Sequence, residues 1–157
     1  MKINSKCLKG LTHEQKMKFS ILCVKTTCSD VDWNNWADAW LNGERGALKC
    51  LNMLRHIVDK QCDPAWNFEA YTITVHASDY ARKVDGLSLY YSQGSSGMTP
   101  REFYACMETI AQSAIVDIIH DMQYLKANID WVSILNDTTK QTKQVNTLKK
   151  DIGNDND

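Results

Sequence analysis

Proline occurs only twice in the 157 residues, at Pro64 and Pro100, and this scarcity is the strongest constraint on the fold. Proline breaks a helix interior because it lacks the backbone N–H and clashes with the preceding turn, but it is tolerated in the first turn. Each proline directly follows a residue that caps helix N-termini well, Asp63 or Thr99. We therefore expect long uninterrupted helices, two of which begin at the prolines.

Apolar residues recur three and four positions apart along most of the chain, which is the period of an amphipathic helix. Helices are predicted over residues 12–27, 30–42, 45–61, 64–84, 100–127 and 129–135. The clearest stripe belongs to the fifth of these and runs through Phe103, Met107, Ile110, Ala111, Ala114, Ile118, Met122 and Leu125. The chain is therefore predicted to be an all-α, single-domain bundle of five to six helices, with the long fifth helix at its centre.

Composition suggests three segments: an N-terminal arm (1–10), a helical domain (11–135) and a polar, partly disordered C-terminal tail (136–157). Asp85-Gly86 is predicted to end the fourth helix, because glycine suits the left-handed position after a helix. Residues 86–98 then form the longest irregular stretch. Four of its residues are too apolar for a plain linker and indicate a turn docked on the core: Leu87, Leu89, Tyr90 and Tyr91.

The overall composition excludes several classes of protein. With 43% apolar residues, 24% charged residues and a net charge of −1, the chain has enough apolar side chains to form a core. No apolar run reaches the roughly 18 residues of a membrane-spanning helix. A basic cluster near the C-terminus (Lys140, Lys143, Lys149, Lys150) is offset by nearby acids (Asp137, Asp151, Asp155, Asp157). We expect neither a membrane nor a nucleic acid as partner.

The six cysteines are widely and irregularly spaced, at positions 7, 23, 28, 50, 62 and 106. They form no C-x-x-C pair and no Cys/His pair at zinc-finger spacing. Several lie on apolar helical stripes, where a free cysteine behaves as a small hydrophobic residue. We expect reduced thiols in a cytoplasmic protein, without a cofactor.

The strongest polar cluster lies on the predicted fifth helix, where Asp117, His120, Asp121 and Tyr124 share one face. Asp and His at this spacing can ligate a metal, or form a general base that a carboxylate orients. A di-metal carboxylate bundle needs a second such motif on another helix, and the sequence has none. A solvated polar face is the preferred interpretation. A metal-binding bundle or an enzyme using Asp117, His120 and Asp121 is the alternative, and no catalytic residues are assigned.

Aromatic side chains mark two candidate contact surfaces. Trp33, Trp36 and Trp40 fall on one face of the predicted second helix, where packing in the core is the preferred interpretation and binding a partner is the alternative. The predicted fourth helix carries a second apolar face, formed by Phe68, Tyr71 and Val75. We predict that this second face binds a protein partner, most simply a second copy in a homodimer.

The tryptophan segment also resembles a known pattern. Its residues Trp33-x-x-Trp36-Ala37-x-x-Trp40-Leu41-x-Gly43 are similar to the W-x-x-W-A-x-x-W-L-x-G motif of small helical proteins encoded by bacteriophages and mobile elements. The resemblance spans residues 19–60, and the helix after the motif is richer in leucine here than in those proteins. It implies a phage-type cytoplasmic accessory protein that binds a host protein. We therefore predict a non-catalytic protein-binding protein and, more specifically, a phage-encoded inhibitor of a host defence protein.

Overall fold

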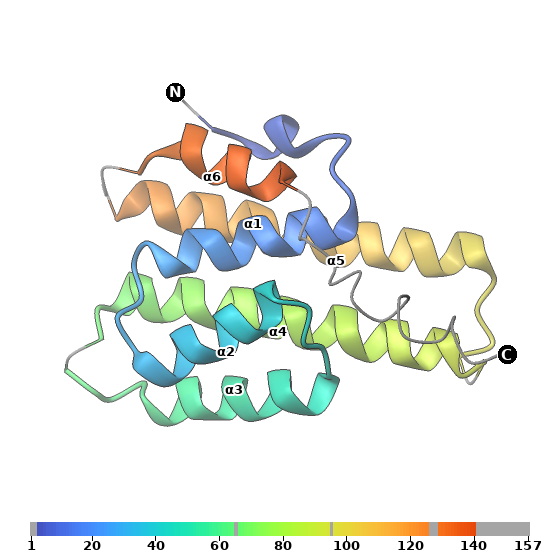
Figure 1. Cartoon of the computed structure of the whole chain (residues 1–157), viewed down its shortest axis with the longest axis horizontal. Coiled ribbons are helices and arrows are strands. Elements are labelled where there is room, and N and C mark those ends of the chain that lie inside the picture. The colour runs from blue at the N-terminus through green and yellow to red at the C-terminus, as the bar shows by residue number, and fades with distance from the viewer. Residues whose placement is uncertain (1–2, 65, 95, 126–128, 141–157) are drawn as a thin grey trace, which may run out of the picture.

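The computed structural model describes residues 3–64, 66–94, 96–125 and 129–140, and these residues form helices and no strands. A short 3-10 helix, η1 (Ser5–Leu8), precedes six α-helices: α1 (His13–Lys25), α2 (Val31–Leu41), α3 (Ala47–Asp59), α4 (Phe68–Ser92), α5 (Pro100–Tyr124) and α6 (Trp131–Thr139). Two helices of 25 residues each, α4 and α5, run side by side through the middle of the molecule (Figure 1). The prediction of an all-α bundle with a long central helix is confirmed.

The shorter helices pack around this central pair. α3 lies against α4, α2 contacts α1 and α3, and α1 contacts both α4 and α5 (Figure 1). α6 lies beside α1, and η1 contacts α5. α1 is buried on two sides, and Phe19 and Ile21 are both fully buried. The core also includes Ile3 and Leu8 from the predicted arm, and α6 extends to Thr139. The predicted disorder of the tail concerns residues that lie almost entirely outside the described ranges.

Side-chain caps fix the beginnings of the helices. The hydroxyl of Thr12 accepts a hydrogen bond from the Gln15 N–H at 3.1 Å, and the Gln15 side chain accepts one from the Thr12 N–H at 2.9 Å. Thr99 and Glu102 repeat this capping box at the start of α5, where Pro100 occupies the first turn. Each box satisfies two backbone groups that the first helical turn leaves without partners, and both can be read from residues three positions apart in the sequence.

The fourth helix differs from the prediction at both ends. It begins at Phe68 rather than Pro64, because the Asn67 side chain caps it by accepting from the Ala70 N–H at 3.1 Å. It continues through Gly86 to Ser92, and Gly94 takes the left-handed conformation after it, with φ +66°. A glycine inside a helix costs about 1 kcal/mol. Packing of this part of α4 on α3, where a Cβ on Gly86 would lie 3.9 Å from the Ala47 Cβ, offsets that cost.

Candidate functional site

A cleft of about 570 Å³ opens where α1, the ends of α2 and α3 with their connection, α4 and α5 meet. Its apolar lining consists of Met17, Trp40, Ala47, Val84, Leu89 and Met107. Its charged and titratable lining consists of His13, Glu14, Arg45 and Asp85. This volume lies within the range of pockets that hold small molecules, and the mixture of apolar walls with a few polar groups is typical of them.

Arg45 closes one side of the cleft. It lies in the short connection between α2 and α3, where Gly43 and Gly46 adopt positive φ angles of 100° and 151°. Its guanidinium carbon is 3.6 Å from the centroid of the Trp40 ring, and the same group donates hydrogen bonds to the Trp40 carbonyl and, at 3.0 Å, to Glu14. The stacking and the ion pair together hold Arg45 against α1.

Asp85 connects the cleft to the start of α3. Its carboxylate accepts a hydrogen bond from the Gly46 N–H at 3.2 Å and one from the Cys50 thiol at 3.4 Å. Burial, assisted by the negative charge of Asp85, raises the pKa of the Cys50 thiol to about 12. Cys50 is therefore a protonated hydrogen-bond donor at neutral pH, rather than a reactive thiolate.

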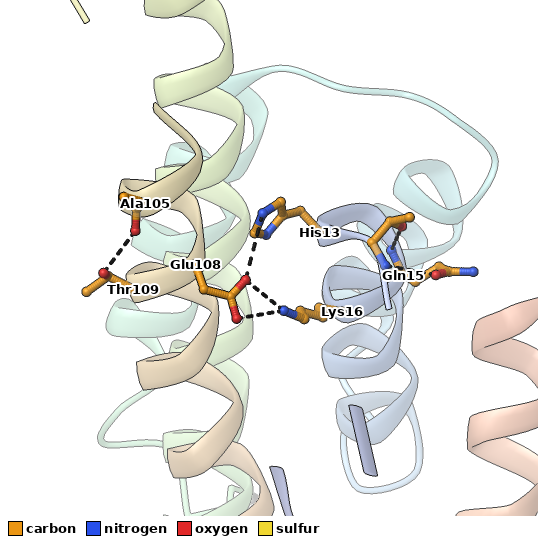
Figure 2. Close-up of polar contacts among 7 residues, drawn as sticks. His13, Gln15, Lys16, Ala105, Glu108 and Thr109 are labelled. Atoms are coloured by element: carbon orange, nitrogen blue, oxygen red, sulfur yellow. Dashed lines mark hydrogen bonds and ion pairs between the residues drawn. The ribbon is translucent and has the colours of Figure 1, made fainter. Parts of the chain in front are cut away.

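A cluster of ionisable groups joins α1 to α5 beside the cleft (Figure 2). The Lys16 ammonium lies 3.0 and 2.9 Å from the two carboxylate oxygens of Glu108, and His13 Nε2 lies 4.0 Å from the same carboxylate. The hydrogen bonds from Lys16 lower the pKa of Glu108 despite partial burial. Burial, and then the charge of Lys16, lower the pKa of His13 below 6.5 against the opposing effect of Glu108, so His13 is neutral at pH 7.

Some buried polar atoms have no hydrogen-bond partner within the described residues. They are His13 Nδ1, Trp40 Nε1, the Tyr80 hydroxyl and Asp121 Oδ2. Two of them, His13 Nδ1 and Trp40 Nε1, belong to residues that line the cleft. Most buried polar groups in folded proteins are satisfied, so unpaired ones beside a cleft indicate where a ligand could bind.

The three tryptophans of α2 lie mainly in the core. Trp33 is fully buried, and its indole N–H donates to the Ser78 hydroxyl at 3.1 Å. Trp40 is 4% exposed, and Trp36 is partly buried with its ring centroid 5.7 Å from that of Trp33. The structure thus shows packing for these indoles, the preferred interpretation of the sequence, and leaves little of Trp33 or Trp40 for a partner.

The predicted contact face of α4 is not a continuous exposed surface. Phe68 is 73% exposed, whereas Tyr71 and Val75 are partly buried and pack against the core. The Tyr71 ring also meets Trp66 edge-on, with 6.5 Å between centroids. A partner could therefore reach Phe68 freely but the other two side chains only in part.

The polar cluster predicted on α5 is divided by the fold. Asp121 lies between two imidazoles, with Oδ1 3.2 Å from His120 Nδ1 and Oδ2 3.7 Å from Nε2 of His76 on α4. Asp117 is exposed and makes no hydrogen bond or ion pair within the described residues. The structure therefore groups Asp121 with His76 rather than with Asp117.

A second acid–histidine group lies at the start of α2. His56 Nε2 is 3.1 Å from Asp30 Oδ1 and 3.9 Å from Asp32 Oδ2, and the three side chains offer ligand atoms within 4.8 Å of one another. They could hold a divalent metal. Burial alone would raise the pKa of Asp30, but hydrogen bonds from the Trp33 N–H and from His56, with the charges of His56 and Lys60, lower it. Capping α2 and pairing with His56 account for Asp30 without a metal.

An exposed aromatic cluster occupies the end of the α4–α5 hairpin, which extends beyond α1, α2 and α3 (Figure 1). We call it the aromatic tip and define it as Leu89, Tyr90, Tyr91, Phe103 and Tyr104. Tyr90 and Tyr104 are 59% and 60% exposed. The rings of Tyr91 and Phe103 stack at 4.2 Å between centroids, and Tyr104 meets Phe103 edge-on at 5.5 Å. Leu89, half exposed, belongs to both the tip and the cleft wall.

The cleft was not predicted from the sequence, and only part of the tip was. Leu89, Tyr90 and Tyr91 were identified as too apolar for a linker, and nothing in the sequence connected them to Tyr104. The apolar residues that continue at helical spacing beyond Gly86 are the signal that could have predicted the extension of α4. The cleft has no comparable signal, because its walls come from five helices and a connection that are spread along the sequence.

Comparisons with known proteins identify no relative of this chain: no family model, no curated protein and no solved structure matches it. Within the described ranges, no helix combines the length and the apolarity that crossing a bilayer requires.

Proposed function

We propose that this chain is a non-catalytic protein that binds another protein through its aromatic tip. The observation that carries the proposal is the exposure of Tyr90 and Tyr104, 59% and 60%, next to the stacked Tyr91–Phe103 pair. Tyrosine and phenylalanine bury large areas and lose little conformational entropy, so they are enriched where proteins bind one another. A cluster of exposed rings on a projecting hairpin is better explained by a contact surface than by stability.

The tip has advantages over the surfaces predicted from sequence. Three of its rings are in contact with one another, those of Tyr91, Phe103 and Tyr104. Phe68 has no comparable exposed neighbours in the predicted face, because Tyr71 and Val75 pack on the core. Its tyrosine hydroxyls provide polar groups that can hydrogen-bond across an interface. The hairpin is formed by the two longest helices, so the rings are held on a rigid support.

In its specific form, the proposal is that a phage encodes this protein, which acts in the cytoplasm and inhibits a host defence protein. The tryptophan pattern of α2 is the sole support for this form. Because Trp33 and Trp40 are buried, packing of the core also accounts for that pattern. Genes for phage structural or anti-defence proteins beside this gene would support the specific form. A second copy of the chain is the other protein partner to consider, and light scattering after size-exclusion chromatography measures it.

The test compares two tip substitutions with a matched control elsewhere on α5. Tyr90→Ser and Tyr104→Ser together remove both exposed rings, and Tyr124→Ser removes a ring that is 69% exposed outside the tip. Each purified variant, with its fold checked by circular dichroism, is immobilised and exposed to a host lysate. A captured protein is then purified, and its affinity is measured by calorimetry.

The proposal predicts a protein that binds the wild type and Tyr124→Ser alike and binds the double tip variant at least about tenfold more weakly, since aromatic hot spots contribute 2 kcal/mol or more. Equal binding by all three variants would refute the tip as the contact surface. Light scattering decides between a partner and self-association: a dimer that the tip substitutions dissociate assigns the surface to a second copy.

Metal binding is a second candidate, and one observation favours it: Asp121 Oδ2 is buried, has no hydrogen-bond partner and lies 3.7 Å from His76 Nε2. Imidazole and carboxylate groups are common ligands of zinc, iron and manganese. Elemental analysis of the purified protein tests this candidate. A stoichiometric metal that is lost in His76→Ala and in His120→Ala would support it, and a metal-free protein that does not bind added zinc would rule it out.

A further inference from the structure

The cleft beside α1 differs from the aromatic tip because it is a concave site rather than a projecting surface. Protein binding at the tip needs no concave site, yet an open cleft of about 570 Å³ lies between α1, the ends of α2 and α3 with their connection, α4 and α5. Its walls are largely apolar and include Met17, Val84 and Met107. A cavity of this size and lining suits a small molecule. Ligand binding in this cleft does not require protein binding at the tip.

The charged groups of the cleft already have hydrogen-bond partners. Glu14 forms an ion pair with Arg45 at 3.0 Å, and Arg45 also stacks on Trp40. Asp85 accepts hydrogen bonds from the Gly46 N–H and the Cys50 thiol. An anionic ligand would have to displace Glu14 from Arg45, and an ion of either sign would lose its hydration in a largely apolar site, which is costly. The lining therefore favours an uncharged ligand.

One hydrogen-bond donor of a lining residue has no acceptor. Trp40 is 4% exposed, and its indole Nε1 is buried without a hydrogen-bond partner in the described structure. The indole N–H can only donate, so its missing partner must be an acceptor. A buried donor that lacks an acceptor destabilises the free protein, and a ligand oxygen that supplies one gains that energy on binding.

We propose that this cleft binds a small, uncharged, largely apolar molecule that carries an oxygen acceptor, and that the Trp40 indole N–H donates a hydrogen bond to this oxygen. His13, whose Nδ1 is also buried and unpaired, provides a second polar group in the same lining. The cleft thus supplies apolar area for affinity and a fixed polar group for selection, the usual division in ligand sites.

The test uses prodan, a neutral naphthalene ketone whose fluorescence depends on the polarity around it. Its affinity for the full-length protein is compared with that of dimethylaminonaphthalene, which lacks the ketone, and of anilinonaphthalene sulfonate, which carries a negative charge. We expect prodan to bind more tightly than either of the other two dyes. Equal or tighter binding of the sulfonate would contradict the preference for an uncharged ligand.

Substitutions locate the bound dye. Ser88 and Ser92 of α4 line the cleft, so Ser88→Phe and Ser92→Phe fill it, whereas Ser113→Phe adds the same ring on the exposed face of α5. Prodan binding should be lost in the two filling variants and kept in Ser113→Phe. Using two filling variants, each checked by its thermal unfolding, guards against one that fails to fold. Binding that a folded filling variant retains would overturn the proposed site.

A third comparison tests the hydrogen bond. Trp40→Phe removes the N–H and should weaken prodan binding by roughly threefold to tenfold, the usual range for one hydrogen bond. It should weaken binding of dimethylaminonaphthalene less, because that dye has no ketone. Trp36→Phe is the matched control, since Trp36 does not line this cleft. An equal loss for both dyes in Trp40→Phe would overturn the assignment of the indole as the recognising donor.

Discussion

Replacing Ser78 by alanine tests the packing between α2 and α4 with a change of one atom. The Ser78 hydroxyl is fully buried; it accepts a hydrogen bond from the Trp33 indole N–H at 3.1 Å and donates one to the Thr74 carbonyl at 2.8 Å. Ser78→Ala leaves the indole N–H buried without an acceptor. The Thr74 carbonyl loses less, because a helix carbonyl can still accept its backbone hydrogen bond.

The expected cost follows from these contacts. Leaving one buried donor without an acceptor costs about 1 to 3 kcal/mol of stability. The higher helix propensity of alanine offsets about 0.5 kcal/mol of that cost. We therefore expect Ser78→Ala to lower the free energy of unfolding by about 0.5 to 2.5 kcal/mol. For a chain of this length that corresponds to a fall of about 1 to 10 °C in Tm.

Urea and thermal unfolding followed by circular dichroism measure this cost, with exposed Ser113→Ala as the matched control. Adding Trp33→Phe completes a double-mutant cycle. Once the indole N–H is gone, the further cost of Ser78→Ala should shrink by about 0.5 kcal/mol or more. If Ser78→Ala is no more destabilising than Ser113→Ala, or if the two core substitutions are additive, the hydrogen bond does not support the core as argued.

Three further results are expected. Thr99→Ala should lower the free energy of unfolding by about 1 kcal/mol, measured by urea unfolding, because it removes the cap of α5; no loss would contradict the capping box. A thiol reagent should modify exposed Cys62 long before buried Cys50, whose pKa is raised to about 12, and equal rates by mass spectrometry would contradict that burial. NMR titration should give His13 a pKa below 6.5. Because its folded pKa is lowered, its contribution to stability is present above 6.5 and is lost as the pH falls through the folded pKa, and a His13→Gln variant should lose less stability over that range.

The helices could be predicted from sequence because their signals are local. The capping boxes at Thr12 and Thr99 depend on residues three positions apart, and the structure contains both. The end of α4 could not be predicted from such a signal. Asp85-Gly86 is a good local stop, but the apolar residues beyond it pack in the folded bundle, and Gly94 ends the helix instead. Tertiary packing worth more than about 1 kcal/mol is enough to override a single glycine.

The candidate sites were harder to predict because they depend on distant residues. Lys16 lies on α1 and is 9% exposed, which is unusual for a lysine and has no explanation in its local sequence. The explanation is Glu108, 92 positions away, whose carboxylate receives two hydrogen bonds from the Lys16 ammonium. Likewise, the sequence places Asp121 in a polar cluster of the fifth helix, but its partner on the neighbouring helix, His76, emerges only from the fold.

The proposed cleft and tip both depend on the length of α4. If α4 ended at Val84, as its sequence suggests, it would lose Ser88, Leu89 and Ser92 from the cleft wall and Tyr90 from the tip. The extension past Gly86 therefore creates both features at once, with Leu89 shared between them. A ligand in the cleft and a protein at the tip would contact the same helical turn. Binding at one could then change affinity at the other, and the prodan and partner assays, performed together, would measure that coupling directly.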